Sequence, residues 1–335
     1  MSKEDLTEIV PPKTELDLNE ILANAEINAV ANYNPNPTLP VCFIVGAPSS
    51  GTTFILQWLA ATNAFTYPTN LISKFYMAPF IGAKIQKMLS ETDSSPLNRI
   101  GHIDKNWKAV FESDLGKTDG LLAPNEFNKF WERFFPSRND DGIKQKKDSY
   151  PNMLILGSEL AALESVYNKP IVMKAVSLNS QIEQLAKQIP NAIFLFIKRD
   201  TFFNIQSLLI QRRKLEGTAD WVSYKPPQYK KLKKLNIYKQ LAGQVHFTNK
   251  LITKGLMKVP KHQKLIFNYE DFCVDPIHFW GRLNNRFNKL GFTLHKNYDG
   301  LDSFTSLNKI KVDKKEKDRI AAAYYSLFGD DITPK

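Results

Sequence analysis

Small and hydroxylated residues follow a short apolar run near the start of the chain. The run, residues 41–45, is rich in β-branched and aromatic residues, which is typical of a buried parallel strand. Residues 46–51 are small and turn-prone, and from Thr52 onward apolar residues recur at helical spacing. Such a strand, loop and helix can cradle a phosphate-like anion, because backbone N–H groups and the positive end of the helix face it. The alternative is an ordinary strand–turn–helix joint.

The loop lacks the lysine of the ATP- and GTP-binding version. That version ends in Gly-Lys-Ser/Thr, and its lysine reaches the β- and γ-phosphates. Here Gly51 is followed by Thr52. The difference argues against a nucleotide or small-molecule kinase, which we keep as an alternative function.

A second group of polar residues follows another predicted strand. Residues 193–198 are apolar and lead directly into Arg199 and Asp200, and Ser207 lies eight positions after Arg199. An arginine at the carboxyl end of a strand can bind a phosphate with two parallel hydrogen bonds. Ser207 would lie two turns along the next helix and face back toward the arginine. The alternatives are a solvent-exposed charge at Arg199 and a routine helix residue at Ser207.

Taken together, the two motifs resemble those of the sulfotransferases that use 3′-phosphoadenosine-5′-phosphosulfate (PAPS). The usual loop of that family reads Pro-(Lys/Arg)-Ser-Gly-Thr-Thr, where this chain has Pro-Ser-Ser-Gly-Thr-Thr at residues 48–53. The family also has a strand that ends in arginine with a serine eight residues later. Residues 171–174, 265–272 and the pair Asp275-Pro276 resemble further family segments. The resemblance covers about residues 41–60 and 170–290.

The resemblance implies a PAPS site, with adenosine 3′,5′-bisphosphate as the product and no metal. It implies that Arg199 and Ser207 hold the 3′-phosphate. It also implies an aromatic ring on the adenine, for which Phe54 is the candidate, although a core role for Phe54 is equally compatible. Backbone N–H groups of the loop would hold the 5′-phosphosulfate, namely those of Ser49, Ser50, Gly51, Thr52 and Thr53.

The chain departs from the family pattern inside the loop. Ser49 occupies the position of the usual lysine or arginine, which in the family supports the bridging oxygen as charge develops on the leaving phosphate. Lys174, at the end of a neighbouring predicted strand, is our candidate for the replacement cation. Its alternative is a surface lysine whose amine extends into water. Thr201 also replaces the usual proline after the arginine motif, which matters less because proline there mainly helps to start the helix.

The acceptor hydroxyl must lose a proton, and family members use histidine or glutamate to remove it. Glu126 stands at the start of a predicted aromatic-rich helix, residues 124–135, and is our candidate base, with His102 as the fallback. Aromatic neighbours could raise the pKa of Glu126 toward a value suited to a general base. The alternative is an acidic first-turn residue that interacts with the helix dipole. The aromatic residues could stack on a sugar, although a core role is commoner.

The elements that position these residues alternate between strand and helix. Helices are predicted at 153–167, 180–188, 202–215 and 240–257, strands at 170–175, 191–198 and 264–272, and further helices from Pro276 and Lys314. This alternation predicts a three-layer α/β fold, a parallel sheet flanked by helices, like that of P-loop proteins and sulfotransferases. We expect an N-terminal arm and linker over residues 1–40. Residues 41–335 would form one domain with a helical insertion at about 61–169.

Composition narrows the partners and the compartment. The net charge of +11 suits an anionic ligand, and no nucleic-acid motif accompanies it. Two cysteines, a polar N-terminus and no membrane-length apolar run favour a cytoplasmic protein. We expect PAPS and a hydroxyl acceptor, a carbohydrate or glycolipid, as partners. The sequence leaves peripheral membrane contact, oligomeric state and a basic lid at 216–240 open, and a catalytically inactive nucleotide-binding module is the non-enzymatic alternative.

Overall fold

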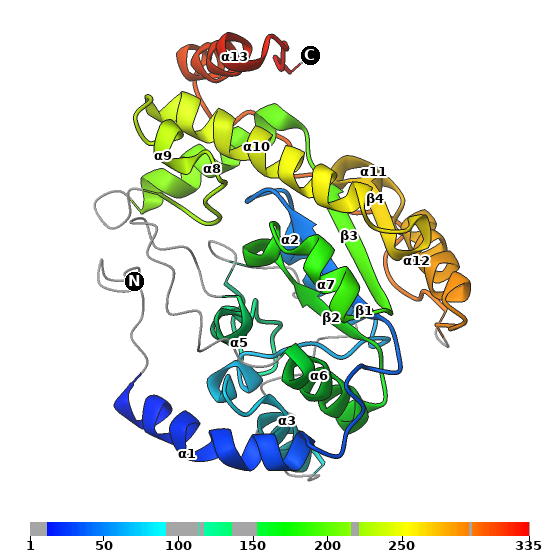
Figure 1. The fold of residues 1–335 in the computed structure, drawn as a ribbon. Helices are drawn as coiled ribbons and strands as arrows, with labels where there is room; N and C mark the ends of the chain where they lie inside the picture. Colours follow the sequence, from blue (N-terminus) through cyan, green and yellow to red (C-terminus); the bar gives the residue numbers. More distant parts are fainter. Residues whose placement is uncertain are drawn as a thin grey trace.

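Four parallel strands form the centre of the computed structural model (Figure 1). The structure describes residues 12–91, 113, 117–135, 153–215, 221–294 and 297–334. The strands are β1 (Val41–Gly46), β2 (Ile171–Lys174), β3 (Ala192–Lys198) and β4 (Lys264–Asn268). They are ordered β2-β1-β3-β4, so the strand that comes first in the chain lies at the centre of the sheet.

Alternate residues of the central strands face opposite layers. In β1, Val41, Phe43 and Val45 pack into one buried cluster, whereas Cys42 and Ile44 pack into another. β3 divides its side chains between the same two clusters. Strands that are covered on both faces must be apolar along their whole length, which explains the continuous apolar runs of the sequence. The predicted three-layer α/β fold is therefore confirmed.

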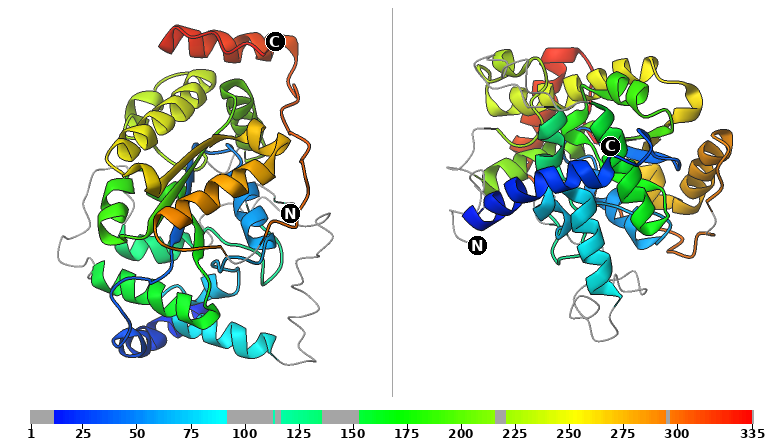
Figure 2. Two further views of the ribbon diagram at one scale, coloured as in Figure 1. Left: turned by 90° about the vertical axis from the view of Figure 1, so that its right-hand side faces the viewer. Right: turned by 60° about the horizontal axis from the view of Figure 1, so that its bottom comes forward.

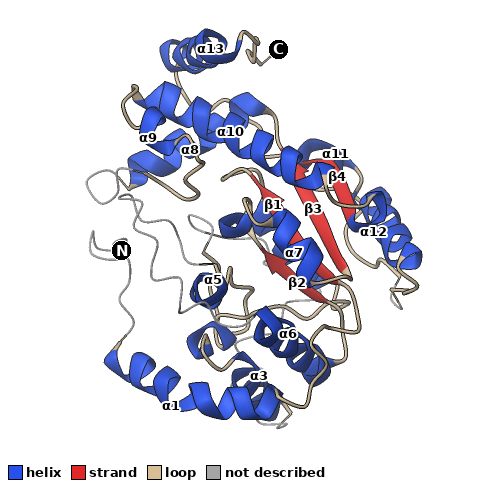
Figure 3. Ribbon diagram, in the orientation of Figure 1, coloured by secondary structure: helices blue, strands red, loops and turns tan. Residues whose placement is uncertain are grey.

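Helices cover both faces of the sheet (Figure 3). One face is covered by α5 (Asn128–Phe134), α6 (Met153–Tyr167), α7 (Ile182–Gln188) and the end of α10 (Ile237–Met257). The other is covered by α2 (Thr52–Ala61), α11 (Tyr269–Val274) and α12 (Pro276–Lys289). Residues at or just after the carboxyl ends of β1, β2 and β3 line one pocket, namely Ser49, Lys174 and Arg199.

The remaining helices flank these layers (Figure 2). α8 (Thr201–Lys214), α10 and α13 (Lys314–Phe328) share a separate apolar cluster. The others are α1 (Lys13–Val30), α3 (Pro79–Ser90), α9 (Tyr229–Leu232) and the short 3₁₀ segments Ile72–Phe75, Val176–Leu178 and Lys261–Gln263. Of these, α1 and α3 add buried residues to the first of the two clusters around the sheet. Within the described ranges, no helix combines the length and apolar character that crossing a membrane requires.

Two element boundaries differ by four residues from those predicted, more than any other. The strand predicted at 264–272 ends at Asn268, and Tyr269 begins α11. Glu270 and Asp271 lie in the first turn of that helix, where negative charge interacts favourably with the helix dipole. The helix predicted over 124–135 begins only at Asn128, which leaves Glu126 in the preceding loop.

A buried carboxylate joins the N-terminal helix to the body of the protein. Glu26 of α1 is fully buried, and it accepts hydrogen bonds from the backbone amides of Phe80 (2.8 Å) and Ile81 (3.1 Å) in the first turn of α3. Burial raises the pKa of Glu26 to about 7, although the two amides act in the opposite direction.

We expect Glu26 to make stability fall as the pH rises from about 4.5 to 7. In this range the unfolded chain has released the proton of Glu26 while the folded protein still holds it, so rising pH favours unfolding. The full effect is on the order of 3 kcal/mol. Urea unfolding at pH 5 and pH 7.5 should show a smaller decrease for Glu26→Gln than for the wild type. Glu20→Gln, exposed on the same helix, is the control, and equal decreases in all three proteins would contradict the prediction.

Candidate active site

Two residues of the loop between β1 and α2 have a left-handed backbone conformation. Gly51, just before α2, adopts a φ of 99°, and a Cβ atom there would lie 2.8 Å from the ring of Tyr269. Ser49 also lies in the left-handed region, with a φ of 62°. Gly51 therefore meets both a conformational and a steric demand for glycine.

Two asparagines from other elements hold this loop in place. The side-chain amide of Asn204, on α8, donates to the carbonyl oxygen of Pro48 at 2.5 Å. That of Asn179, after β2, donates to the carbonyl oxygen of Gly46 at 3.0 Å. Neither residue was singled out from the sequence, because the spacing along the chain does not reveal which carbonyl groups they reach.

A pocket of about 1110 Å³ opens beside the loop and brings nearly all the predicted site residues together. The exception is Ser50, which is fully buried and whose backbone N–H donates to the carbonyl oxygen of Ala47 at 3.1 Å. Nine of the ten predicted residues line the pocket: Ser49, Gly51, Thr52, Thr53, Phe54, Glu126, Lys174, Arg199 and Ser207.

The charge of the pocket is strongly positive. Among the described lining residues, six are cations and only Glu126 is a carboxylate. Such a lining attracts a polyanionic ligand. The cations are Lys74, Lys117, Lys174, Arg199, Lys214 and Lys311.

Lys174 joins the loop to the opposite wall of the pocket. Its side chain is only 7% exposed, and its ammonium group donates to the Thr53 hydroxyl at 2.8 Å. The same ammonium group forms an ion pair with the carboxylate of Glu126. Lys174 is therefore a buried pocket residue, and the alternative of a lysine that extends into water does not hold.

Hydrogen bonds across the chain position Glu126. Asn125 donates through its side-chain amide to Asn70 at 2.7 Å and through its backbone N–H to the carbonyl oxygen of Pro68 at 2.8 Å. Asn70 in turn donates to the carbonyl oxygen of Gly120 at 2.8 Å. These hydrogen bonds hold the loop that ends at Glu126, and α5 begins only at Asn128. The alternative that Glu126 lies in the first turn of a helix is therefore wrong. The fallback base His102 lies outside the described residues.

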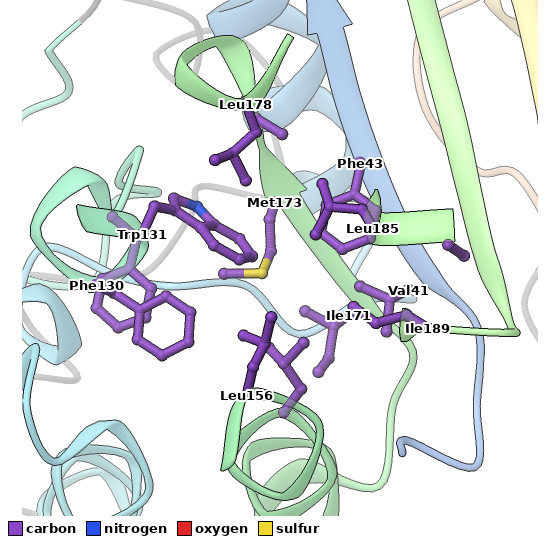
Figure 4. Packing of buried hydrophobic residues seen from close by; sticks show 14 of the residues in the cluster. Val41, Phe43, Phe130, Trp131, Leu156, Ile171, Met173, Leu178, Leu185 and Ile189 are labelled. Atoms are coloured by element: carbon purple, nitrogen blue, oxygen red, sulfur yellow. The ribbon is translucent and has the colours of Figure 1, made fainter. Parts of the chain in front are cut away.

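The aromatic side chains next to Glu126 belong to the core. Phe127, Phe130 and Trp131 are each about 1% exposed and do not line the pocket. Figure 4 shows the ring of Trp131 beside Met173 of β2, and Phe130 belongs to the same buried cluster. They are therefore buried away from any sugar in the pocket, and the idea that they stack on one is wrong.

Arg199 is held against the loop. Its Nη1 donates to the carbonyl oxygen of Ser49 at 2.9 Å, and its guanidinium group lies 5.0 Å from the ring centre of Tyr269. Burial lowers the pKa of Arg199, while Tyr269 and Glu270 act in the opposite direction. Ser207 lines the same pocket from α8, as its spacing from Arg199 predicted. Arg199 is thus a partly buried cation in the pocket, not a free surface charge.

Phe54 meets both of its proposed environments. Its ring makes edge-to-face contacts with Tyr269, Phe272 and Phe304, and it also lines the pocket. Phe54 therefore belongs to the apolar layer at α2 and also forms part of the pocket wall.

The basic segment at 216–240 does not place its lysines in the pocket. Residues 216–220 lie outside the described part of the chain, and Val222 and Ser223 do line the pocket. The lysines of the segment are elsewhere, so a lid that binds the anion through them is not what the structure contains. They are Lys225, Lys230, Lys231, Lys233, Lys234 and Lys239.

Comparison with known proteins assigns the family. The model of the Sulfotransferase family matches residues 40–288. This chain belongs to the sulfotransferase family. The matched range contains β1 to β4 and ends in α12, so it includes the loop, Lys174 and Arg199.

One solved sulfotransferase structure resembles the chain in fold over most of its length. The sulfotransferase STF9 from Mycobacterium avium is 15% identical with a TM-score of 0.51, and the match covers 96% of this chain and 87% of STF9. STF1 from Mycobacterium tuberculosis is 13% identical with a TM-score of 0.49, over 92% and 83% of the two chains. A comparison with curated proteins found no match.

Proposed function

We propose that this sulfotransferase transfers the sulfuryl group of PAPS to an acceptor hydroxyl group. The observation that carries the proposal is the contact between Arg199 and the carbonyl oxygen of Ser49, which joins the two motifs in one cationic pocket with Ser207. Arg199 and Ser207 would hold the 3′-phosphate of the donor. The N-terminal end of α2 would hold its 5′-phosphosulfate.

Two groups beside Thr53, from other elements, would serve the transfer itself: Lys174 at the end of β2 and Glu126 before α5. The acceptor oxygen attacks sulfur while the bond between sulfur and the bridging oxygen breaks, and the electron pair of that bond stays on the 5′-phosphate. The Glu126 carboxylate would take the proton of the acceptor hydroxyl. Lys174, which contacts Thr53 of the loop, would stabilise the charge that develops on the bridging oxygen. Glu126 and Lys174 form an ion pair with each other. The base for the attacking hydroxyl and the cation for the leaving phosphate would therefore lie side by side.

We propose a polar, hydroxyl-rich acceptor, a carbohydrate or glycolipid. The pocket wall around Glu126 is lined by amide, hydroxyl and ammonium groups, which suit hydroxyl-rich ligands. The residues of this wall are Asn70, Ser73, Lys74, Thr118, Asn125 and Asn128. We also propose the cytoplasm as the compartment, because Cys42 and Cys273 are free and buried.

Nucleotide binding separates this function from its alternatives. By calorimetry, we expect adenosine 3′,5′-bisphosphate to bind the wild type more tightly than adenosine 5′-phosphate. Binding of ATP with Mg²⁺ but not of the bisphosphate would favour a kinase and overturn the proposal. Tight binding of the bisphosphate without transfer from PAPS to any of a broad panel of hydroxyl acceptors would favour an inactive binding module.

Arg199→Ala tests the donor site directly. We expect it to weaken binding of the bisphosphate by about 100-fold, because charge-assisted hydrogen bonds to a phosphate are lost. Binding of adenosine 5′-phosphate should change much less. Arg282→Ala is the matched control, since Arg282 also donates to a backbone carbonyl but lies on α12 outside the pocket. Equal losses for both nucleotides would contradict the role of Arg199.

A further inference from the structure

A segment beyond the family match packs against the donor end of the pocket. We call residues 303–311, between α12 and α13, the strap; Figure 2 shows the orange connection that contains it. The ring of Phe304 lies 5.1 Å from that of Phe54, and the backbone N–H of Leu307 donates to the Tyr269 hydroxyl at 3.1 Å. Gln206 of α8 accepts from the Lys311 N–H at 2.8 Å and donates to the Lys309 carbonyl at 2.9 Å. The strap is therefore anchored on both sides of Arg199.

The strap supplies one hydrogen-bond acceptor to Arg199. The Nε of Arg199 donates to the side-chain oxygen of Asn308 at 2.9 Å. The side-chain amide of Asn308 donates to the carboxylate of Glu270 at 2.6 Å, and the same carboxylate oxygen accepts from the backbone N–H of Asp200 at 2.9 Å. Because its amide must face the carboxylate, the carbonyl oxygen of Asn308 must face the arginine. The hydrogen bonds from Glu270 through Asn308 to Arg199 therefore fix the orientation of the guanidinium group.

A neutral residue at position 308 has a consequence for charge. Arginine has five N–H donors. Within the described part of the chain, the bonds to Asn308 and Ser49 use two of them, so N–H groups remain that can bind a ligand. A carboxylate at this position would pair with Arg199 and compete with a bound phosphate. Asn308 places an amide between the carboxylate of Glu270 and the arginine. The arginine is thus oriented while its charge stays available.

We propose that Asn308 is a positioning residue of the 3′-phosphate site, which holds Arg199 in its phosphate-binding orientation and separates its charge from Glu270. This inference rests on the proposed function, since it requires Arg199 to bind the 3′-phosphate. Asn308 itself does not line the pocket. Its effect must therefore pass through Arg199, and that dependence can be measured.

The test compares two substitutions of Asn308 in full-length protein. By calorimetry, we expect Asn308→Ala to weaken binding of adenosine 3′,5′-bisphosphate by about 10-fold. Asn308→Asp should weaken it by about 100-fold, because the new carboxylate would pair with Arg199 and compete with the phosphate. Binding of adenosine 5′-phosphate should change less than threefold in both. Ser303→Ala, exposed in the same strap, is the control and should bind both nucleotides as the wild type does. Thermal unfolding identifies any variant that fails to fold.

A double-mutant cycle separates positioning from a general structural role. In the Arg199→Ala background, Asn308→Ala should cause no further loss of bisphosphate binding, because the residue through which it acts is gone. Additive losses, equal losses for both nucleotides, or no loss in the single variant would each overturn the inference. If the wild type itself does not distinguish the two nucleotides, the proposed function fails instead. The two failures are therefore distinguishable.

Discussion

Replacing Glu126 by glutamine is expected to lower kcat by about 10²–10⁴-fold, because an amide cannot take the proton of the acceptor hydroxyl. Glutamine keeps an oxygen that can accept from Lys174, so the two walls of the pocket should stay connected. The affinity for adenosine 3′,5′-bisphosphate should change less than about threefold. Steady-state kinetics with PAPS and calorimetry of the bisphosphate measure the two quantities separately.

The matched control for this prediction lies on the neighbouring helix. Glu132, on α5, has an exposed side chain and does not line the pocket. Glu132→Gln should therefore retain the kcat of the wild type. A fully active Glu126→Gln variant would exclude Glu126 as the base and direct attention to His102.

Replacing Lys174 by methionine is expected to lower kcat by about 10²–10³-fold, the usual cost of removing one group that stabilises charge in the transition state. Methionine is apolar and of similar length, so the site keeps its volume. The affinity for PAPS should fall much less than kcat, because the bridging oxygen carries little charge until its bond to sulfur breaks. A parallel fall in both quantities would mean that Lys174 only supports the structure or binds the nucleotide in the ground state.

A lysine introduced into the loop at position 49 should partly rescue the Lys174→Met variant. Ser49 occupies the position where the family pattern has a lysine or arginine, and its φ of 62° already places a non-glycine residue in the left-handed region. Ser49→Lys therefore adds little new backbone strain. Introduced together with Lys174→Met, it should restore part of the lost kcat. If the double variant is no more active than Lys174→Met although it binds the bisphosphate, a cation exchange between the two positions is not supported.

Local sequence patterns were sufficient for most of the fold. β1 and β3 have runs of apolar residues that only burial on both faces explains, and the helix predicted at 153–167 is α6 with the same limits. The order of the strands did not follow from these patterns, because pairing between parallel strands depends on contacts between distant segments. The start of α5 was misplaced for the same reason. Asn125, which precedes α5, bonds to Pro68 and Asn70, far away in the chain.

The candidate site divides in a similar way. The loop residues, Arg199 and Ser207 stand at short, regular spacings, so the sequence alone predicted them together. Asn308 lies more than 100 positions from Arg199, and no local pattern connects them. The aromatic residues beside Glu126 misled for the opposite reason, since proximity in sequence does not say which face of a helix points into the core.

The central position of β1 has a consequence for synthesis of the chain. Val41 pairs with Ile171, 130 positions later, and with Ala192 in the other neighbouring strand. At about 5–20 residues per second, a ribosome needs on the order of 10 s to produce the first partner strand. During this interval β1 is an apolar segment without its neighbours, and sheets built from such distant partners form slowly. The loop that follows β1 is held by Asn179 and Asn204, which are also made later, so it can take its final shape only after these segments have emerged.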